Sequence, residues 1–198
     1  MSYPIPAASH ELTHEIKKSR FIARAAYAPD RPAAMALLAQ AKLDYPDARH
    51  HCWAYLLGDP HNAASAAMSD DGEPGGTAGK PILNVLQHKG VGDVMLIVIR
   101  YFGGIKLGAG GLVRAYSAAS QQVMETLPIE TRIAKVTCSL QVGFAQEQSV
   151  RHWLAVHGGE VVEVIYAAGA GISLTLPEQN LNLLKTYALE LGATLTAL

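Results

Sequence analysis

Positive charges and glycines are concentrated in one stretch of the chain, residues 91–124, whose residue types suit the binding of an anion. Arg100, Lys106 and Arg114 lie in and around a loop that is unusually rich in glycine. Backbone N–H groups at a helix start, with the helix dipole behind them, favour anions, and basic side chains add positive charge. The stretch predicts a phosphate or nucleic-acid backbone site; the alternative is a tight strand-to-helix turn with solvated charges. The glycines are Gly103, Gly104, Gly108, Gly110 and Gly111.

The flanking segments predict how this loop is held. Val94 to Ile99 is an apolar run rich in β-branched residues, and its length and composition favour a buried strand over a helix. Leu112 to Met124 contains good helix formers and no proline, so we expect a helix there. We therefore expect a mixed α/β layer in which 94–99 is the central strand and Arg100 lies at its end.

A second glycine-rich loop, residues 69–81, lies upstream and carries acidic side chains. Asp70, Asp71 and Glu73 could bind magnesium or supply a general base. They could equally be turn residues, since Asp and Gly are common in tight turns. The loop does not match a P-loop, because Pro81 rather than Ser or Thr follows Lys80. Close backbone approach is one of the few uses for so many glycines, so we expect the two loops to be neighbours.

Aromatic residues extend the predicted binding site. Tyr101 and Phe102 follow the apolar strand, and such rings can stack on unpaired bases while basic side chains hold phosphates. Because Arg100 also follows this strand directly, it could be half-buried and paired with an acid such as Asp70 or Asp71. The candidate residues for binding nucleic acid or another anion are Arg49, Lys80, Arg100, Lys106, Arg114, Gly76, Thr77, Gly103 and Gly104, and the candidate acidic site is Asp70, Asp71 and Glu73.

Histidines and cysteines predict no metal centre. His50 and His51 are adjacent in an expected strand, 50–57, where neighbouring side chains point to opposite faces, so at most one faces a cleft. Cys52 and Cys138 are far apart, in apolar surroundings, and neither has a partner at metal-ligand spacing. Both are expected to be buried reduced thiols. We assign no metal, no cofactor and no catalytic residue from the sequence.

Three motifs together resemble the YigZ/IMPACT family. They are HHCWAY at 50–55, SDDGEPGGTAGKPIL at 69–83 and GVGDVMLIVIRYFGGIKLGAGGLVRAY at 90–116. The resemblance covers Phe21 to about Leu127 and continues after Ile133 in pattern only. It implies a first domain like domain 2 of ribosomal protein S5, related to domain IV of elongation factor G, and a second domain like domain V of that factor. One departure is Gly75, where the family usually has serine; Thr77 is the nearby hydroxyl.

Composition and charge predict an ordinary globular protein. The hydrophobic share is 49% and the charged share 17%. Residues 1–128 carry 12 Lys and Arg against 11 Asp and Glu, a net +1, and residues 129–198 carry 4 against 6, a net −2. Any nucleic-acid footprint is therefore expected to be a local patch on the first half. The N-terminus has no signal-peptide pattern and no apolar run is long enough to span a bilayer, which predicts a soluble cytoplasmic protein with no membrane partner.

The pattern changes near residues 127–132, so we expect domains at 1–128 and 129–198. The second half predicts strand, helix, two strands, helix and strand, which is the ferredoxin-like βαββαβ order. The overall fold class is therefore expected to be α+β, with an S5-domain-2-like α/β sandwich followed by a ferredoxin-like domain. The expected elements are 133–142, 146–156, 160–166, 171–176, 177–190 and 193–198.

Three functions remain open at this point. The first is a non-enzymatic binding protein for RNA or the ribosome, with translation regulation and a translation-related protein partner implied by the family resemblance. The second is an enzyme acting on a phosphorylated or anionic small molecule, for which the sequence offers no nucleophile–base pair. The third is a protein-interaction module, which the near-neutral charge also fits. Salt-dependent binding favours the first, dependence on magnesium the second, and salt-insensitive capture of a protein the third.

Overall fold

The computed structural model describes residues 2–197, which divide into two compact units. The first unit is Ser2–Arg132 and the second begins at Ile133. Two short strands, β1 (Tyr3–Pro6) and β7 (Ile129–Arg132), pair antiparallel within the first unit. Residues 129–132 therefore belong with the first unit, whereas the change of sequence pattern places the boundary after residue 128.

Asp93 connects the β1–β7 pair to the rest of the first unit through hydrogen bonds and an ion pair. Its almost fully buried carboxylate accepts hydrogen bonds from the Tyr3 hydroxyl (2.8 Å) and the Gly58 N–H (2.7 Å), and it forms an ion pair with Arg132. Burial and the bond to Asp93 raise the pKa of Tyr3 to about 12. These contacts tie the first and last strands of the unit together.

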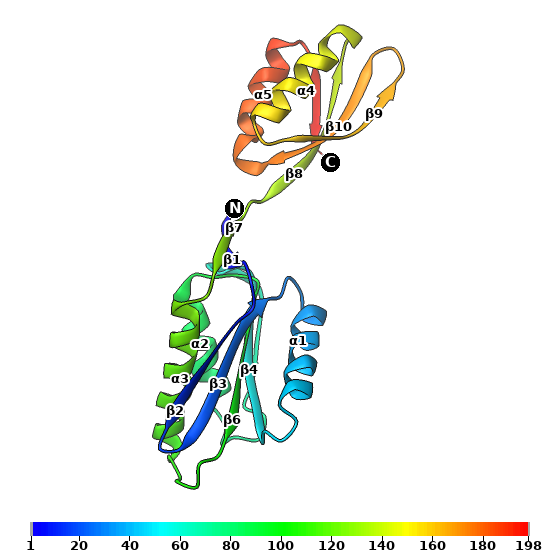
Figure 1. The fold of residues 1–198 in the computed structure, drawn as a ribbon. Coiled ribbons are helices and arrows are strands. Elements are labelled where there is room, and N and C mark those ends of the chain that lie inside the picture. Colours follow the sequence, from blue (N-terminus) through cyan, green and yellow to red (C-terminus); the bar gives the residue numbers. More distant parts are fainter. Residues whose placement is uncertain (1, 198) are drawn as a thin grey trace. The chain divides into compact units, whose positions relative to one another are not determined.

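The first unit is built on a five-stranded antiparallel sheet (Figure 1). The central strand, β6 (Val94–Tyr101), covers the predicted 94–99 run and is buried on both faces, so the predicted central strand is confirmed. Its residues alternate between two cores, as a strand with a helix layer on each face requires. The strand order is β2 (His10–Ile16), β3 (Ser19–Tyr27), β6 (Val94–Tyr101), β4 (His50–Asp59) and β5 (Asn62–Ser69).

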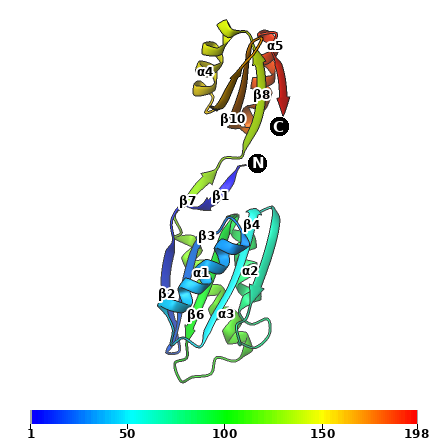
Figure 2. The ribbon, with the colours of Figure 1, turned by 90° about the vertical axis from the view of Figure 1, so that its right-hand side faces the viewer.

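Helices cover both faces of this sheet. α1 (Arg31–Asp44) lies on one face, whereas α2 (Gly79–Lys89) and α3 (Ala109–Glu125) lie on the other (Figures 1 and 2). Asp30 caps the start of α1 by accepting a hydrogen bond from the Ala33 N–H at 2.8 Å, and Pro32 lies in the first turn. The arrangement leaves the loop between β6 and α3 at one end of the sheet.

Two elements of the first unit differ from their sequence signals. The residues of β2 are only half-buried or exposed in alternation and their apolar signal is weak, so the sequence alone does not mark this strand. α3 begins at Ala109, not at Leu112, so Gly110 and Gly111 are helical. The helix start therefore reaches into the glycine loop itself.

The second unit is a four-stranded antiparallel sheet with two helices on one face, in the βαββαβ order predicted. Its spatial order, β11-β8-β10-β9, is that of a ferredoxin-like fold. Short 3₁₀ turns at Phe144–Gln146 and Glu178–Asn180 precede the helices. The elements are β8 (Lys135–Val142), α4 (Glu147–Val156), β9 (Glu160–Tyr166), β10 (Ala170–Pro177), α5 (Leu181–Glu190) and β11 (Thr194–Ala197).

The expected fold class is therefore confirmed: the chain is α+β, with an S5-domain-2-like first domain and a ferredoxin-like second domain. Among the helices of residues 2–197, none combines the length and the apolar character that crossing a bilayer requires.

Candidate anion-binding site

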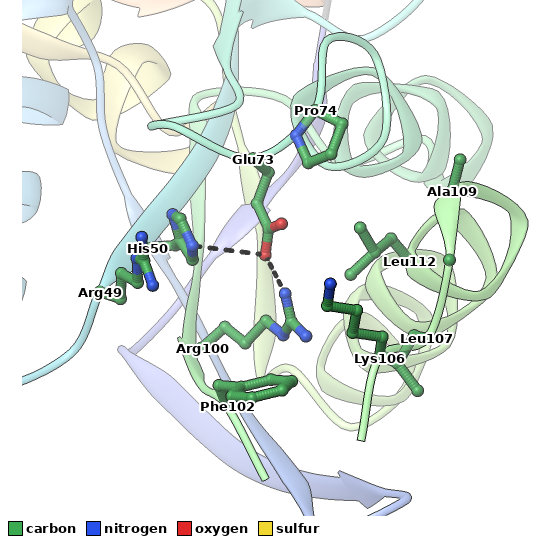
Figure 3. A pocket seen from close by; sticks show the side chains of 11 residues that line it. Arg49, His50, Glu73, Pro74, Arg100, Phe102, Lys106, Leu107, Ala109 and Leu112 are labelled. Atoms are coloured by element: carbon green, nitrogen blue, oxygen red, sulfur yellow. Dashed lines mark hydrogen bonds and ion pairs between the residues drawn. The ribbon is translucent and has the colours of Figure 1, made fainter. Parts of the chain in front are cut away.

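A cavity of about 360 Å³ opens at the end of the first domain's sheet where the two glycine-rich loops meet (Figure 3). One wall comes from the start of β4, a second from the 69–78 loop, and the rest from the end of β6, the following loop and the start of α3. Residues of both loops line this cavity, which agrees with the expectation that the loops are neighbours. Its lining residues are Arg49, His50, Glu73, Pro74, Arg100, Phe102, Lys106, Leu107, Gly108, Ala109 and Leu112.

Arg100 forms a buried ion pair with Glu73 at one side of the cavity. Its Nη1 lies 2.6 Å from Glu73 Oε1, and only 8% and 4% of the two side chains are exposed. The sequence prediction of a partly buried, paired Arg100 holds, but its partner is Glu73 and not Asp70 or Asp71. Asp70 and Asp71 instead accept hydrogen bonds from backbone N–H groups.

A chain of buried polar groups continues behind Glu73, away from the cavity. The Tyr116 hydroxyl donates to Glu73 Oε1 at 2.9 Å, and Cys52 Sγ lies 3.3 Å from the same hydroxyl. Burial raises the pKa of both groups, that of Cys52 to about 12, so both stay protonated. The expectation of a buried reduced Cys52 is confirmed, and Cys138 is also free and buried. Tyr116 was not singled out from the sequence, because a tyrosine in an apolar helix face carries no distinctive signal.

Asp70 organises the first glycine loop. Its carboxylate accepts hydrogen bonds from the N–H groups of Gly76, Ala78 and Gly79 at 2.8–2.9 Å. Burial raises its pKa, but these three bonds outweigh that effect and hold the pKa below its usual value. Asp70 therefore occupies the start of α2, where an external anion would otherwise bind.

Asp71 and Thr77 also stabilise this loop. Asp71 Oδ2 accepts from the His51 N–H at 2.6 Å, and the Thr77 hydroxyl donates to the Pro74 carbonyl at 2.7 Å. The acidic triplet thus consists of two loop-stabilising aspartates and one carboxylate paired with arginine. Within residues 2–197, no three His, Cys, Asp or Glu side chains gather in a metal-binding arrangement.

The start of α3 differs from that of α2. Gly108 precedes the helix with a φ of +72°, a conformation that favours glycine, and no side chain caps the first turn. The first turn also contains no Asp or Glu. Because Gly108 and Ala109 line the cavity, the positive end of this 17-residue helix opens into it without a carboxylate of its own.

Two exposed basic side chains and one exposed ring complete the site. Arg49 and Lys106 line the cavity and have no ion-pair partner among residues 2–197. Phe102 is 54% exposed, and its ring centre lies 5.7 Å from the Arg100 guanidinium carbon. With Arg100 balanced by Glu73, Arg49 and Lys106 leave the cavity positively charged.

Not every predicted residue lies here. Of the candidates, Arg49, Arg100 and Lys106 line the cavity, whereas Lys80, Arg114, Gly76, Thr77, Gly103 and Gly104 are not among its lining residues. The Gly76 N–H is already bonded to Asp70, and Gly103 lies against the backbone of Lys18. A binding role for these six stays a prediction. Pro74, Leu107 and Leu112 were missed because apolar lining residues cannot be told from core residues in a sequence.

The adjacent histidines separate as expected for a strand. His50 lines the cavity, with Nδ1 2.8 Å from the Asp71 carbonyl and Nε2 4.0 Å from Glu73 Oε1 (Figure 3). His51 is 5% exposed, and burial lowers its pKa. Only His50 can therefore contact a ligand in the cavity.

Comparisons with known proteins agree with this architecture. The Impact N-terminal domain model matches residues 17–124, and a domain of unknown function, DUF1949, matches residues 140–186. The IMPACT family member YigZ of Escherichia coli is 39% identical over 176 residues, which cover 89% of this chain and 86% of that protein. An IMPACT family member of Haemophilus influenzae is 36% identical, with 90% and 87% covered.

A solved structure extends the similarity to three dimensions. The crystal structure of a hypothetical protein superposes with a TM-score of 0.76 at 36% identity and covers 100% of this chain and 97% of that one. The sequence motifs, the domain order and the similarity along most of both chains lead to one conclusion: the chain belongs to the IMPACT family, with an Impact N-terminal domain followed by a DUF1949 domain.

Proposed function

We propose that this chain is a non-enzymatic binding protein whose first domain binds the phosphate backbone of single-stranded RNA in the cavity between the glycine loops. The observation that carries the proposal is the uncapped start of α3, which shares this cavity with Lys106 and Arg49. A phosphate here would accept hydrogen bonds from the first N–H groups of α3. The two basic side chains would supply charge that no carboxylate offsets within residues 2–197.

The ring of Phe102 favours an unpaired strand over a duplex. It is exposed and lines the cavity beside the basic side chains, where an unpaired base could stack on it. A duplex keeps its base faces covered and offers none for such stacking. Because the first domain's net charge is only +1, we expect weak binding without strong sequence preference.

Family membership suggests where such an RNA would be found. The resemblance described above implies translational control for members of this family, so we place the RNA, or a translation-related protein that presents it, in the translation machinery. This placement is part of the proposal and rests on membership of the family alone.

The direct test is a binding titration with a labelled single-stranded RNA. One phosphate contact on a single strand contributes about 0.7 to the slope of log K against log salt concentration. Between 1 M and 0.1 M salt its loss therefore corresponds to a roughly fivefold change in K, so Lys106→Ala should weaken binding roughly fivefold at 0.1 M salt. Lys89→Ala is the matched control: it removes the same charge from the same domain, at the far end of α2 beside Glu125. Equal effects of the two substitutions would contradict the proposed site.

A phosphorylated small molecule is the second candidate, favoured by the size of the cavity. A volume of about 360 Å³ is within the range of small-molecule pockets, and Leu107 and Leu112 provide apolar walls. Chemistry on such a ligand would need a free acid or base, whereas Glu73 is held by both Arg100 and Tyr116. A mononucleotide that displaces the RNA completely at similar concentration would favour this candidate.

A further inference from the structure

The second domain carries a stack of three rings on its helical face. The Trp153 ring lies 3.9 Å from the His157 ring, with 15° between their planes, and 5.1 Å from the Tyr187 ring, with 7° between their planes. Trp153 and His157 come from α4 and its C-terminal cap, and Tyr187 comes from α5. Near-parallel rings at these distances are stacked on one another, so the three side chains form one aromatic cluster.

The rings are held in place before any ligand binds. His157 Nδ1 lies 2.8 Å from the Trp153 carbonyl and donates to it, which fixes the imidazole over the tryptophan. The His157 carbonyl in turn accepts from Asn180 Nδ2 at 2.9 Å, which ties the end of α4 to the turn before α5. A surface that is already ordered loses little conformational entropy on binding.

A cavity of about 590 Å³ adjoins these rings. All three rings line it, together with the polar side chains of Gln148, Ser149 and His152. Among residues 2–197, those three polar side chains are exposed and have no hydrogen-bond partner in the structure. None of the described lining residues is Asp, Glu, Lys or Arg, so the cavity suits a planar ligand without net charge that has hydrogen-bonding groups on its edge.

From this combination we infer that the second domain has its own binding site for an unpaired nucleobase, on the helical face formed by α4 and α5. The base stacks on the ring cluster, and Gln148, Ser149 and His152 face its polar edge. The open face of the sheet offers no such surface on β8, where the outward side chains are Thr137, Ser139 and Gln141. The site is independent of the anion cavity in the first domain, because it rests on different residues and uses no phosphate.

Fluorescence of Trp153 provides a direct readout. The chain has two tryptophans, and Trp53 lies in the first domain, stacked on Tyr55. In a Trp53→Phe variant of the full chain, adenosine should therefore quench the remaining Trp153 emission saturably. Adenosine carries no phosphate, so binding should persist at high salt. Failure of this test would leave the proposal for the first domain unaffected, and failure of that proposal would not alter this result.

Matched substitutions locate the ligand. Tyr187→Leu removes one ring and should weaken adenosine binding at least about tenfold, which is the scale of one stacking contact. Tyr166→Leu removes an exposed tyrosine of the same domain outside the cavity and should leave binding unchanged. Absence of quenching, or equal effects of the two substitutions, would overturn the inference. If Tyr187→Leu does not fold, ring-proton shifts of His157 and Tyr187 in the Trp53→Phe chain on adding adenosine decide the question: their absence overturns it.

A second comparison distinguishes the two sources of such a base, single-stranded RNA and a free nucleoside or nucleotide. A short oligoadenylate that binds more tightly than adenosine, and an abasic oligomer of the same length that does not quench Trp153, would identify single-stranded RNA as the source. Equal affinity for adenosine and the oligoadenylate would identify a free nucleoside or nucleotide. Quenching by a proline-rich peptide but not by adenosine would contradict the nucleobase site, since aromatic grooves also bind such peptides.

Discussion

Arg100 and Glu73 join the central strand of the first domain to its acidic loop through a buried ion pair of 2.6 Å. The same Glu73 oxygen accepts the Tyr116 hydroxyl, so the pair also reaches α3. Strand, loop and helix thus meet at one carboxylate beside the cavity. This contact fixes one side of the proposed phosphate site and leaves Arg49 and Lys106 free to supply its charge.

Removing one partner of this pair should destabilise the fold. Arg100→Leu leaves Glu73 buried without its cation, which costs about 3–5 kcal/mol in comparable pairs. The double variant Arg100→Leu, Glu73→Leu removes both charges and should recover much of that loss. Urea unfolding of the two variants and the wild type measures the difference; a double variant less stable than Arg100→Leu would contradict this account of the pair.

Asp70 should stabilise the fold in a pH-dependent manner. Its pKa is depressed in the folded state, so its contribution is fully present above its unfolded pKa of about 3.9 and is lost as the pH falls through the lower folded value. Asp70→Asn replaces a charged acceptor of three N–H groups with a neutral one, and should lower the unfolding free energy by about 1 kcal/mol at pH 7 because hydrogen bonds to charged groups are the stronger ones. Thermal melts of both proteins should converge as the pH approaches 2; a constant difference would be inconsistent with this role.

Two glycines of the loops should respond oppositely to alanine. A Cβ at Gly103 would lie 2.0 Å from the backbone carbonyl of Lys18, so Gly103→Ala must shift the chain and should cost about 1–3 kcal/mol. Gly75 has open space around its Cβ position and an ordinary φ, so Gly75→Ala should change stability by less than about 0.5 kcal/mol. Denaturation midpoints compare the two; equal losses would refute the close approach at Gly103.

Both cysteines should be inert in the folded protein. Burial raises the pKa of Cys52 to about 12 and also raises that of Cys138, so neither forms appreciable thiolate near pH 8. Alkylation by iodoacetamide at pH 8 should be slow for both and should accelerate sharply in denaturant. Rapid modification of native Cys52 would show that the buried polar chain behind Glu73 is open to solvent.

The sequence predicts the first domain's framework well because its signals are strong. The β6 run is apolar on both faces, and the Asp30 cap and Pro32 mark the start of α1. The partner of Arg100 could not be predicted, because three acids lie close together in one loop. The hydrogen bonds that Asp70 and Asp71 accept from backbone N–H groups become visible only in the folded structure. The weak alternation of β2 concealed a strand whose position is set by pairing with β3.

Arg114 belongs to the binding site predicted from the sequence but not to the cavity found in the structure. The sequence groups it with Lys106 as a phosphate contact, but it is exposed on α3 and does not line the cavity. Arg114→Ala should therefore weaken RNA binding less than Lys106→Ala in the same titration. An equal or larger effect of Arg114→Ala would indicate that the RNA path follows the outside of α3 instead.

The salt dependence of RNA binding tests the central claim most directly. The logarithm of the binding constant for single-stranded RNA should fall linearly with the logarithm of salt concentration, and the double variant Arg49→Ala, Lys106→Ala should reduce that slope by about 1.4, or 0.7 for each lost contact. The account predicts this reduction with an unchanged thermal melt, since both side chains are exposed and unpaired within residues 2–197. A wild-type protein that shows no salt-dependent binding, or a double variant with the wild-type slope, would contradict it.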